Sequence, residues 1–537
     1  MDSELLQFLK DPGSYEHAPD RVEHVQTHIS HVFIADPYVY KFKKPVNFEF
    51  LDFSTLEKRK HYCRREVELN RRLCEDIYLG VIPVRKRNNS FNIGESGEGD
   101  IVEYAVKMNK LSEQYFLHSF IEREELNKQH LDRIANTLSA FYNRQDPDNE
   151  IRKWGQIEKI RYNTDENFRQ TESYIGDTIH ENSYLAIKNY TGHYYDRFDA
   201  LFERRIENNC IVDGHGDLHL EHIHITPEKV RIYDCIEFND RFRYGDTAAD
   251  LAFLAMDLDF NGYSGLERYF ITRMADLLGD PDLPTHLDFY KCYRAYVKGK
   301  VKSLQSSEEE VGEEGREKAR KRAREYFDLS LHYAALGSRA TVLVVMGRIA
   351  TGKSTTASVL SDRLNVARYS SDRIRKKLMG LPITKHTDES KKEELYSKEM
   401  SNVTYQELLK KANKHIDKHE SVILDATYSR EKQRRKLIEH MEEWDADYCF
   451  VEVQADDATI KNRLKMREGE EGVISDAREE DFEELNRYYQ PPEEIGGDHI
   501  IRLSTAGSEN KTLSELYDEL IKRNLDWVGT QIDEEGQ

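Results

Sequence analysis

The pattern of apolar and polar residues predicts strands at the start of the chain and helices after them. Residues 21–46 alternate between the two kinds of side chain, as half-buried strands do. A helix is expected from Ser54, opened by a capping box of Ser54 and Glu57. Residues 101–111 predict a further strand, and residues 125–205 are mostly helical in pattern.

The helix expected after Ser54 places a carboxylate on its inward face. Glu66 shares this face with Cys63, Val67 and Asn70. A buried carboxylate needs a cationic partner, and a lysine of the preceding strand would supply one. The plain alternative is an ordinary amphipathic helix whose Glu66 reaches the rim.

A second region with strands begins at residue 342. Residues 342–345 are apolar, and residues 347–354 then fit G-x-x-x-x-G-K-[ST] ahead of an amphipathic helix. Backbone N–H groups and the helix N-terminus attract phosphate there, Lys353 reaches the β- and γ-phosphates, and Ser354 can hold Mg²⁺. The predicted nucleotide site comprises Gly347, Arg348, Ile349, Ala350, Thr351, Gly352, Lys353, Ser354 and Thr355.

Polar residues follow two further strands of this region. Residues 421–427 are apolar and include Asp425, which is typical of a Walker B strand whose carboxylate reaches Mg²⁺ through water. Asp372 and Arg375 follow an earlier strand, and ligands of doubly wound sheets bind at such strand ends. Asp372 can accept a proton from an attacking hydroxyl, and Arg375 can steer the acceptor. The alternative is that Asp372 only caps a basic helix.

The P-loop together with D-x-x-R resembles the small P-loop kinases of the AAA, polynucleotide kinase, gluconate kinase and zeta-toxin type. The resemblance implies a three-layer α/β fold, with Lys353, Asp372 and Arg375 in catalysis. A later helix carries Arg463 and Arg467 on one face, and in the resembling kinases such a helix forms a lid over the phosphates. Two arginines on a solvated face are the plain alternative.

A second group of chemically active residues lies at 211–260. Histidines and acids crowd together there between apolar pairs: His215, Asp217, His219, Glu221, His222 and His224. A zinc or iron site is one interpretation, but the spacing does not match H-E-x-x-H and the stretch is not helical in pattern.

The segment HGDLH, followed by Asp234 and by G-D-x-x-x-D-L-A, resembles the aminoglycoside/choline phosphotransferase family over roughly residues 20–300. The strings THISHVF, FLDFSTLEKR, YLGVIPV and DCIEFNDRFR are similar to a bacterial subfamily of uncharacterised kinases fused to a P-loop kinase. The resemblance implies an N-terminal α+β protein-kinase-like fold and a C-terminal P-loop kinase.

The resemblance also implies roles for individual residues. Asp217 would be the catalytic base, Asp234 would hold Mg²⁺, and Lys41 would bind the α- and β-phosphates and pair with Glu66. Lys43 is the alternative lysine. By the same resemblance, the backbone of Met108 would contact adenine. For Asp246 and Asp250 the plain structural interpretation is preferred, in which they cap and brace the catalytic loop.

Two features depart from the family pattern. No G-x-G-x-x-G loop precedes the strand lysine, so the phosphates would be covered by Thr27, His28 or Ser30, or only weakly. The family has a metal-binding Asn at the position of His222. Imidazole ligates divalent ions, but Mg²⁺ prefers oxygen, so an altered metal preference, a single-metal site and an inactive kinase all stay open.

The length and the net charge of the chain set limits on these expectations. A chain of 537 residues predicts several domains, placed here at 1–304, at a charged helical linker over 305–337, and at 338–537. The net charge of −21 disfavours nucleic acid and anionic membranes as partners. No stretch has the length of a membrane span, and the six cysteines show no C-x-x-C pair, so a cytoplasmic protein is expected.

The sequence therefore predicts a phosphotransferase that uses ATP and Mg²⁺ at two kinase-type sites and acts on a hydroxyl of a small molecule. One alternative is an ATP-binding regulator with a degenerate N-terminal kinase. Another is a kinase of nucleic-acid 5′-hydroxyls, which the acidic charge disfavours. Neither the acceptor nor the oligomeric state can be predicted from the sequence.

Overall fold

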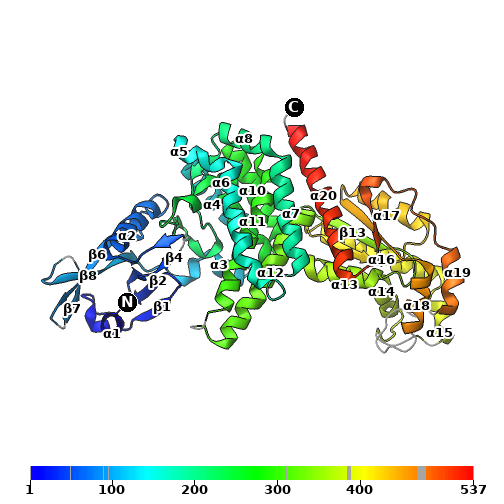
Figure 1. The fold of residues 1–537 in the computed structure, drawn as a ribbon, viewed down its shortest axis with the longest axis horizontal. Coiled ribbons are helices and arrows are strands. Elements are labelled where there is room, and N and C mark those ends of the chain that lie inside the picture. The colour runs from blue at the N-terminus through cyan, green and yellow to red at the C-terminus, as the bar shows by residue number, and fades with distance from the viewer. Residues whose placement is uncertain are drawn as a thin grey trace. The chain divides into compact units, whose positions relative to one another are not determined.

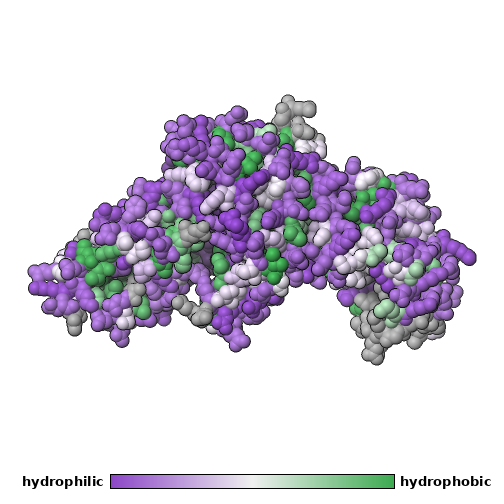
Figure 2. Space-filling view, in the orientation of Figure 1, coloured by the Kyte–Doolittle hydropathy of each residue, from purple (hydrophilic) through white to green (hydrophobic). Residues whose placement is uncertain are grey.

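A computed structural model describes residues 2–48, 50–88, 90–94, 96–308, 311–383, 387, 389–467 and 479–535. The chain forms two compact units, the first made of Met1–Tyr162 and Asp199–Leu287 and the second of Asn163–Phe198 and Asp288–Gln537. Figure 2 shows a surface coloured mainly as hydrophilic, in keeping with a composition that is 33% charged. Among the described helices, none is both long and apolar enough to cross a bilayer.

The first unit contains an antiparallel sheet whose strands lie in the order β1-β2-β3-β8-β6-β7 (Figure 1). These strands are β1 Glu23–Gln26, β2 Ser30–Ala35, β3 Tyr38–Lys43, β6 Tyr78–Arg87, β7 Ser90–Ile93 and β8 Asp100–Asn109. The central register pairs Lys41 of β3 with Val106 of β8. Helix α2 (Leu56–Asn70) packs on β6 and β8. Its buried Cys63, Glu66 and Asn70 confirm the predicted inward face.

The predicted capping box of α2 is wrong. Thr55 is the N-cap, and its hydroxyl accepts a hydrogen bond from the backbone N–H of Lys58 at 3.3 Å. The backbone N–H of Ser54 instead donates to the carboxylate of Asp52 at 3.0 Å. Two neighbouring hydroxyl residues compete for one cap position, and the pairing of Ser54 with Asp52 leaves the cap to Thr55.

The remainder of the first unit is mostly helical and surrounds a loop that connects short strands. Strand β9 (Ile211–Asp213) pairs with β12 (Tyr244–Asp246), and β10 (Ile223–Ile225) pairs with β11 (Val230–Ile232). The other elements are α1 Ser3–Lys10, β4 Asn47–Phe48, β5 Leu51–Asp52, α3 Leu117–Glu122, α4 Lys128–Tyr142, α5 Asn149–Arg152, α8 Asp199–Glu207, α9 Thr247–Phe260 and α10 Ser264–Leu278. A sheet with α2 on it, followed by helices around a loop, confirms the α+β class and the predicted protein-kinase-like arrangement.

The second unit is built on a parallel sheet in the order β14-β15-β13-β16-β17. The strands are β13 Thr341–Met346, β14 Ala367–Ser370, β15 Val422–Asp425, β16 Asp447–Gln454 and β17 Ile500–Ser504. Their helices are α13 Lys353–Leu364, α14 Ser371–Leu378, α15 Glu389–Leu395, α16 Lys398–Ile416, α17 Glu431–Glu443, α18 Asp457–Arg467 and α19 Phe482–Arg487. Every residue of β13 is buried, as a central parallel strand requires.

Alternate residues of β13 face different helices. Val342 and Val344 belong to a core cluster with Leu408 of α16 and Leu437 of α17. Leu343 points to the opposite face of the strand, and α13 also packs on β13. Helices therefore cover both faces of the sheet, which confirms the predicted three-layer α/β fold.

An additional group of helices belongs to the second unit: α7 Glu181–Arg197, α12 Glu313–Leu336 and α20 Glu509–Glu535, which pack on one another. The unit boundary falls inside α6 (Ile157–Thr171) and α11 (Leu283–Ser306). This division differs from the predicted one, in which residues 305–337 form a linker. Helix α12 has a buried face that includes Ala323, Phe327 and Leu331, so the charged residues cover only its other side.

We expect Asp328 of α12 to make the stability of the second unit depend on pH. Burial raises the pKa of Asp328 to about 7, and Glu325 adds to this while Arg363 opposes it. The folded state therefore holds a proton that the unfolded state has released, and the free energy of unfolding falls as pH rises from about 4 to about 7. Urea unfolding, followed by circular dichroism at several pH values in this range, measures the free energy of unfolding. This free energy should decline less with pH in Asp328→Asn than in the wild type.

The matched control is Glu317→Gln, whose carboxylate lies on the same helix and is 63% exposed. This variant should follow the wild-type pH profile. An Asp328→Asn profile parallel to that of the wild type would show that Asp328 titrates normally.

Candidate active sites

The loop that follows β9 is held by the carboxylate of Asp250. The backbone N–H groups of His215 and Gly216 each donate to Asp250 at 2.8 Å, and the hydroxyl of Tyr142 donates to it at 2.7 Å. Gly216 has φ +84°, a conformation that favours glycine. Asp246 caps α9 through the N–H of Ala248 at 2.8 Å. The predicted bracing of the loop is confirmed for Asp250, whereas Asp246 caps the helix that carries Asp250 and forms an ion pair with the buried Arg205 at 2.6 Å.

His215 fixes the position of the next functional residue. Its Nε2 lies 2.9 Å from the carbonyl oxygen of Tyr233, which can only accept, so Nε2 donates. Its Nδ1 then accepts from the backbone N–H of Asp217 at 3.3 Å. Burial lowers the pKa of His215, so the neutral ring that this bonding pattern needs is the stable form.

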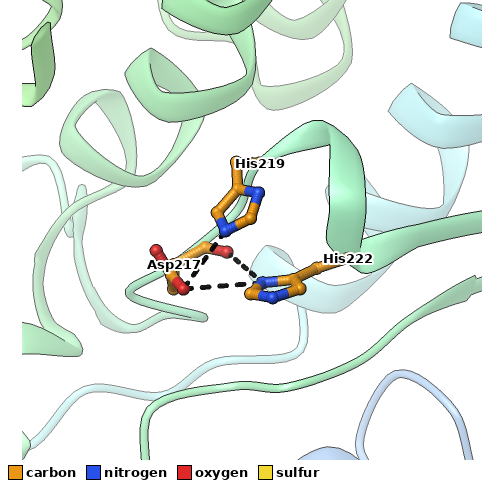
Figure 3. A group of neighbouring side chains, drawn as sticks. All are labelled: Asp217, His219 and His222. Atoms are coloured by element: carbon orange, nitrogen blue, oxygen red, sulfur yellow. Dashed lines mark hydrogen bonds and ion pairs between the residues drawn. The ribbon is translucent and has the colours of Figure 1, made fainter. Parts of the chain in front are cut away.

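Asp217, His219 and His222 lie together in this loop (Figure 3). Oδ2 of Asp217 is 3.4 Å from Nε2 of His219 and 3.6 Å from Nδ1 of His222. Nδ1 of His222 also lies 2.9 Å from the carbonyl oxygen of Asp217. Burial lowers the pKa of His222 to about 4, so its ring is neutral near pH 7. The Asp217 side chain is 33% exposed and can be reached by a substrate.

Two lysines of β3 share one buried carboxylate of α2. Nζ of Lys41 is 3.0 Å from Oε1 of Glu66, and Nζ of Lys43 is 2.8 Å from Oε2. Glu66 is fully buried. Burial alone would raise the pKa of Glu66, but the two ammonium groups outweigh it and lower the pKa. The sequence predicted Lys41 with Lys43 as the alternative, and the structure pairs both with Glu66.

The two lysines differ in their second partner. Nζ of Lys41 donates to Oδ1 of Asp234 at 2.5 Å, while Lys43 forms an ion pair with Glu237. Lys41 is 15% exposed and Lys43 only 1%. Lys41 is therefore the lysine placed to reach a ligand, and Lys43 is a buried support.

Asp234 lies at the centre of the first site. Burial would raise its pKa, but Lys41 outweighs this and holds the pKa below the usual range. Its φ of +62° is uncommon for a residue other than glycine. The strained backbone is held because the N–H of Asp234 donates to the hydroxyl of Tyr78 at 3.1 Å and that of Cys235 donates to Asn70 at 2.8 Å. Oδ2 of Asp234 faces Nε2 of His222 at 3.6 Å.

A divalent ion fits this first site through mixed donors. Asp234 and His222 offer a carboxylate oxygen and an imidazole nitrogen. Asp217, His219 and His222 form a second possible set, with ligand atoms within 4.8 Å of one another. Mg²⁺ favours sites made of oxygen, so neither set matches it well.

The remaining residues predicted for the first site lie at its edges. Met108 is the next-to-last residue of β8, opposite Val39 of β3, and its contact with adenine stays a prediction. The turn before β2 is closed by Thr27, whose N–H donates to the carbonyl oxygen of Ser30 at 2.9 Å. His28 in this turn is exposed, and the covering of phosphates by Thr27, His28 or Ser30 stays a prediction.

The second site is the predicted P-loop between β13 and α13. Gly347 has φ +137°, and a Cβ there would lie 2.3 Å from the carbonyl oxygen of Val453, so only glycine fits. Nζ of Lys353 donates to the carbonyl oxygen of Arg348 at 2.6 Å. Thr351 donates to the same oxygen at 3.0 Å. The loop thus holds its lysine across its own concave side, where a phosphate would otherwise accept from it.

Asp425 ends β15 beside the P-loop, as predicted. Its Oδ1 is 3.4 Å from the hydroxyl of Ser354, and its Oδ2 accepts from Arg368 at 2.6 Å. A serine hydroxyl and a carboxylate are oxygen donors only, which fits Mg²⁺. Arg368 of β14 was not predicted, although a charge inside a short strand is a signal that could have found it.

Of the two predicted lid arginines, the structure describes the side chain of Arg463. Arg463 donates to the carbonyl oxygen of Thr351 at 2.9 Å and to the hydroxyl and carbonyl of Thr505 at 3.0 and 2.9 Å. It therefore ties the outside of the P-loop to the loop after β17. The side chain of Arg467 lies outside the described residues. Whether either arginine closes over phosphates stays a prediction.

The other predicted P-loop and acceptor residues have clear positions. Arg348 donates to Asp457 at 2.6 Å, to Asn486 at 3.0 Å and to the carbonyl oxygen of Ala455 at 2.6 Å. The carbonyl oxygen of Ala350 is 3.4 Å from Arg463. Ile349 packs against a small apolar cluster, Gly352 is the N-cap of α13, and Ser354 and Thr355 are exposed in its first turn.

Asp372 and Arg375 form an ion pair at the start of α14. Nη1 of Arg375 is 2.9 Å from Oδ1 of Asp372. The alternative that Asp372 is the N-cap is wrong, because Ser370 occupies that position and Asp372 lies in the first turn. Arg375 is 8% exposed, and its guanidinium lies 4.9 Å from the ring centre of Tyr396. The roles of this pair in catalysis stay predictions.

Comparisons with known proteins agree with this arrangement. Residues 342–492 match the AAA domain family. The uncharacterised protein Rv2004c of Mycobacterium tuberculosis is 30% identical over 411 residues, which cover 76% of this chain and 79% of that protein.

Solved structures that resemble parts of the chain include a gluconokinase from Sinorhizobium meliloti, at 14% identity and a TM-score of 0.26, over 36% of this chain and 97% of the other. A choline kinase from Cryptosporidium parvum has 11% identity and a TM-score of 0.38, over 62% of this chain and 95% of the other. At these scores, neither likeness bears on the activity of this chain.

We expect Glu66→Gln to destabilise the first unit strongly. The change leaves Lys41 and Lys43 with a neutral partner in a buried site, which costs about 3–5 kcal/mol in the free energy of unfolding. Urea unfolding of the full chain should show the transition of the first unit at lower denaturant. Glu68→Gln, on the same helix but 71% exposed, is the matched control and should change little. Equal effects of the two changes would contradict the central role of Glu66.

Proposed function

From the premise that this chain belongs to the same family as Rv2004c of Mycobacterium tuberculosis, we propose that it is an ATP-dependent phosphotransferase with two kinase-type sites. Each site would transfer the γ-phosphate of ATP to a hydroxyl of a small molecule. The relative is itself uncharacterised, so the proposal depends on the two sites. The observation that carries it is the convergence of Lys41, Glu66, Asp234 and Asp217 from four separate elements of the first unit.

In the first site, each residue would act on a different part of the transfer. Lys41 would neutralise the α- and β-phosphates from its place beside Asp234, and Glu66 would hold the lysine there. A divalent ion held by Asp234 would neutralise charge on the β- and γ-phosphates. Asp217 would accept the proton of the acceptor hydroxyl as the oxygen attacks phosphorus.

In the second site, the P-loop would bind the phosphates through its backbone N–H groups. Phosphate oxygens would replace the carbonyl oxygen of Arg348 as the acceptor for Lys353. Ser354 and Asp425 would hold Mg²⁺ directly or through water. Asp372 at the carboxyl end of β14 would accept the proton of the second acceptor, and Arg375 would orient it.

A regulatory role for the first unit is the second candidate, favoured by His222 in the position of an asparagine. It predicts nucleotide binding without transfer. It is weakened by the intact arrangement of Lys41, Glu66 and Asp234, which supports transfer as well as binding.

The test is phosphoryl transfer by the full chain, measured as ADP release with sugars, amino alcohols and aminoglycosides as acceptors. Asp217→Asn removes the base but keeps the shape, and should lower transfer by the first site about 10²- to 10⁴-fold. Glu228→Gln, on an exposed turn of the same unit, is the control and should leave the rate unchanged. If Asp217→Asn leaves the rate of transfer unchanged while Lys353→Ala abolishes all transfer, the first unit is a binding module and not a kinase.

The second site is tested by nucleotide affinity. Lys353→Ala removes a charged donor to phosphate and should weaken ATP binding at this site about 10- to 100-fold. Isothermal titration calorimetry of the full chain should resolve the change. Lys410→Ala, whose ammonium is 75% exposed on α16, is the matched control. Unchanged ATP affinity in Lys353→Ala would refute the P-loop assignment.

A further inference from the structure

His222 has one ring nitrogen committed and one available. Its Nδ1 lies 2.9 Å from the carbonyl oxygen of Asp217, which can only accept, so Nδ1 carries the proton. In the neutral ring, Nε2 then carries the lone pair. Figure 3 shows the second nitrogen pointing away from Asp217.

That lone pair faces an oxygen with which it cannot form a hydrogen bond. Nε2 is 3.6 Å from Oδ2 of Asp234, and both atoms are acceptors. Oδ1 of Asp234 is occupied by Lys41, so Oδ2 is the oxygen turned toward the histidine. Within the described part of the chain, no donor is hydrogen-bonded to either atom. Two acceptors that face each other without a donor can share a cation, and with the His222 side chain 12% exposed and that of Asp234 35% exposed an ion can reach them.

The separation of the two atoms suits a shared ion. Donors about 2.1 Å from one metal, at angles between octahedral and tetrahedral, lie roughly 3.0–3.5 Å apart. The observed 3.6 Å needs only a small side-chain movement to reach this range. Both donors are already oriented, since the carbonyl of Asp217 holds His222 and Lys41 holds Asp234. Such support is typical of residues that ligate metals.

The chemistry of the donors selects the ion. Imidazole nitrogen binds first-row transition ions well, whereas Mg²⁺ prefers oxygen and gives up its water reluctantly. We propose that the first site binds a divalent transition ion, with Mn²⁺ as the representative, through Nε2 of His222 and Oδ2 of Asp234 in preference to Mg²⁺. This inference rests on the proposed function only in placing the ion at a nucleotide site.

The neighbouring set of Asp217, His219 and His222 is the competing location. An ion there would occupy Oδ2 of Asp217, one of the two oxygens of the carboxylate that is the base in the proposed function. It would also need Nδ1 of His222, 3.6 Å from Oδ2 of Asp217, to give up its proton and with it the 2.9 Å hydrogen bond to the carbonyl oxygen. The second unit offers Ser354 and Asp425 instead, which are oxygen donors suited to Mg²⁺. The chain would thus hold two sites with different ion preferences.

The test uses the full chain with Mn²⁺ alone and pulsed electron paramagnetic resonance, which detects a nitrogen bound directly to the ion. Wild type should show this nitrogen coupling, and His222→Asn should lose it while still binding the ion through oxygen. His219→Asn is the matched control and should keep the coupling. When Mg²⁺ competes with Mn²⁺ for the site, displacement of Mn²⁺ from wild type should need at least about tenfold more Mg²⁺ than Mn²⁺. In His222→Asn, near-equal amounts of the two ions should suffice.

Other results would overturn the proposal. No nitrogen coupling in wild type would exclude an imidazole ligand without any variant, so a misfolded His222→Asn does not decide the matter. Coupling lost in His219→Asn would place the ion on the competing set. Bound Mn²⁺ with nitrogen coupling but no transfer dependent on Asp217 would leave the metal site standing and refute the proposed function.

Discussion

One buried carboxylate shared by two lysines sets the geometry of the first unit. Glu66 is fully buried, so it cannot stay ionised without Lys41 and Lys43, and they in turn need Asp234 and Glu237. The network joins β3, α2 and the segment after β11. Burial makes every one of these charges costly without its partners, so the arrangement is stable only when all three parts are in place. The first unit is therefore stable only when these site residues are arranged as described.

In the second unit, the groups that need partners belong to the backbone. The P-loop gathers N–H groups that need an acceptor and exposes carbonyls that need a donor. Arg463 and Lys353 supply donors to its carbonyl oxygens, and Thr505 links it to the edge of the sheet. Arg368 likewise neutralises Asp425. Contacts within the protein therefore hold the shape of the loop.

Local patterns predicted the parts of both sites that lie within one segment. The P-loop and the inward face that carries Glu66 follow from spacing along the chain, and the bracing of the catalytic loop by Asp250 was expected from the motif that contains it. Residues that only tertiary packing brings to the sites carry no local sequence pattern that predicts their contacts. Glu237, Arg368 and Thr505 lie far in sequence from the groups they bind. The cap of α2 was misplaced because two adjacent hydroxyl residues fit the same rule, and only the pairing of Ser54 with Asp52 decides between them.

The division of the chain has a consequence for its synthesis. The second unit takes α7 from the middle of the sequence and α12 and α20 from later parts. When the ribosome has completed the first unit at Leu287, α7 still lacks α12 and α20, which pack on it in the folded chain. The packing of α7 is therefore complete only when α20, the last helix of the chain, has been made. A fragment cut near residue 304 would lack both α12 and α20, so a separately expressed N-terminal half needs a different boundary if α7 is not to become an aggregation-prone helix.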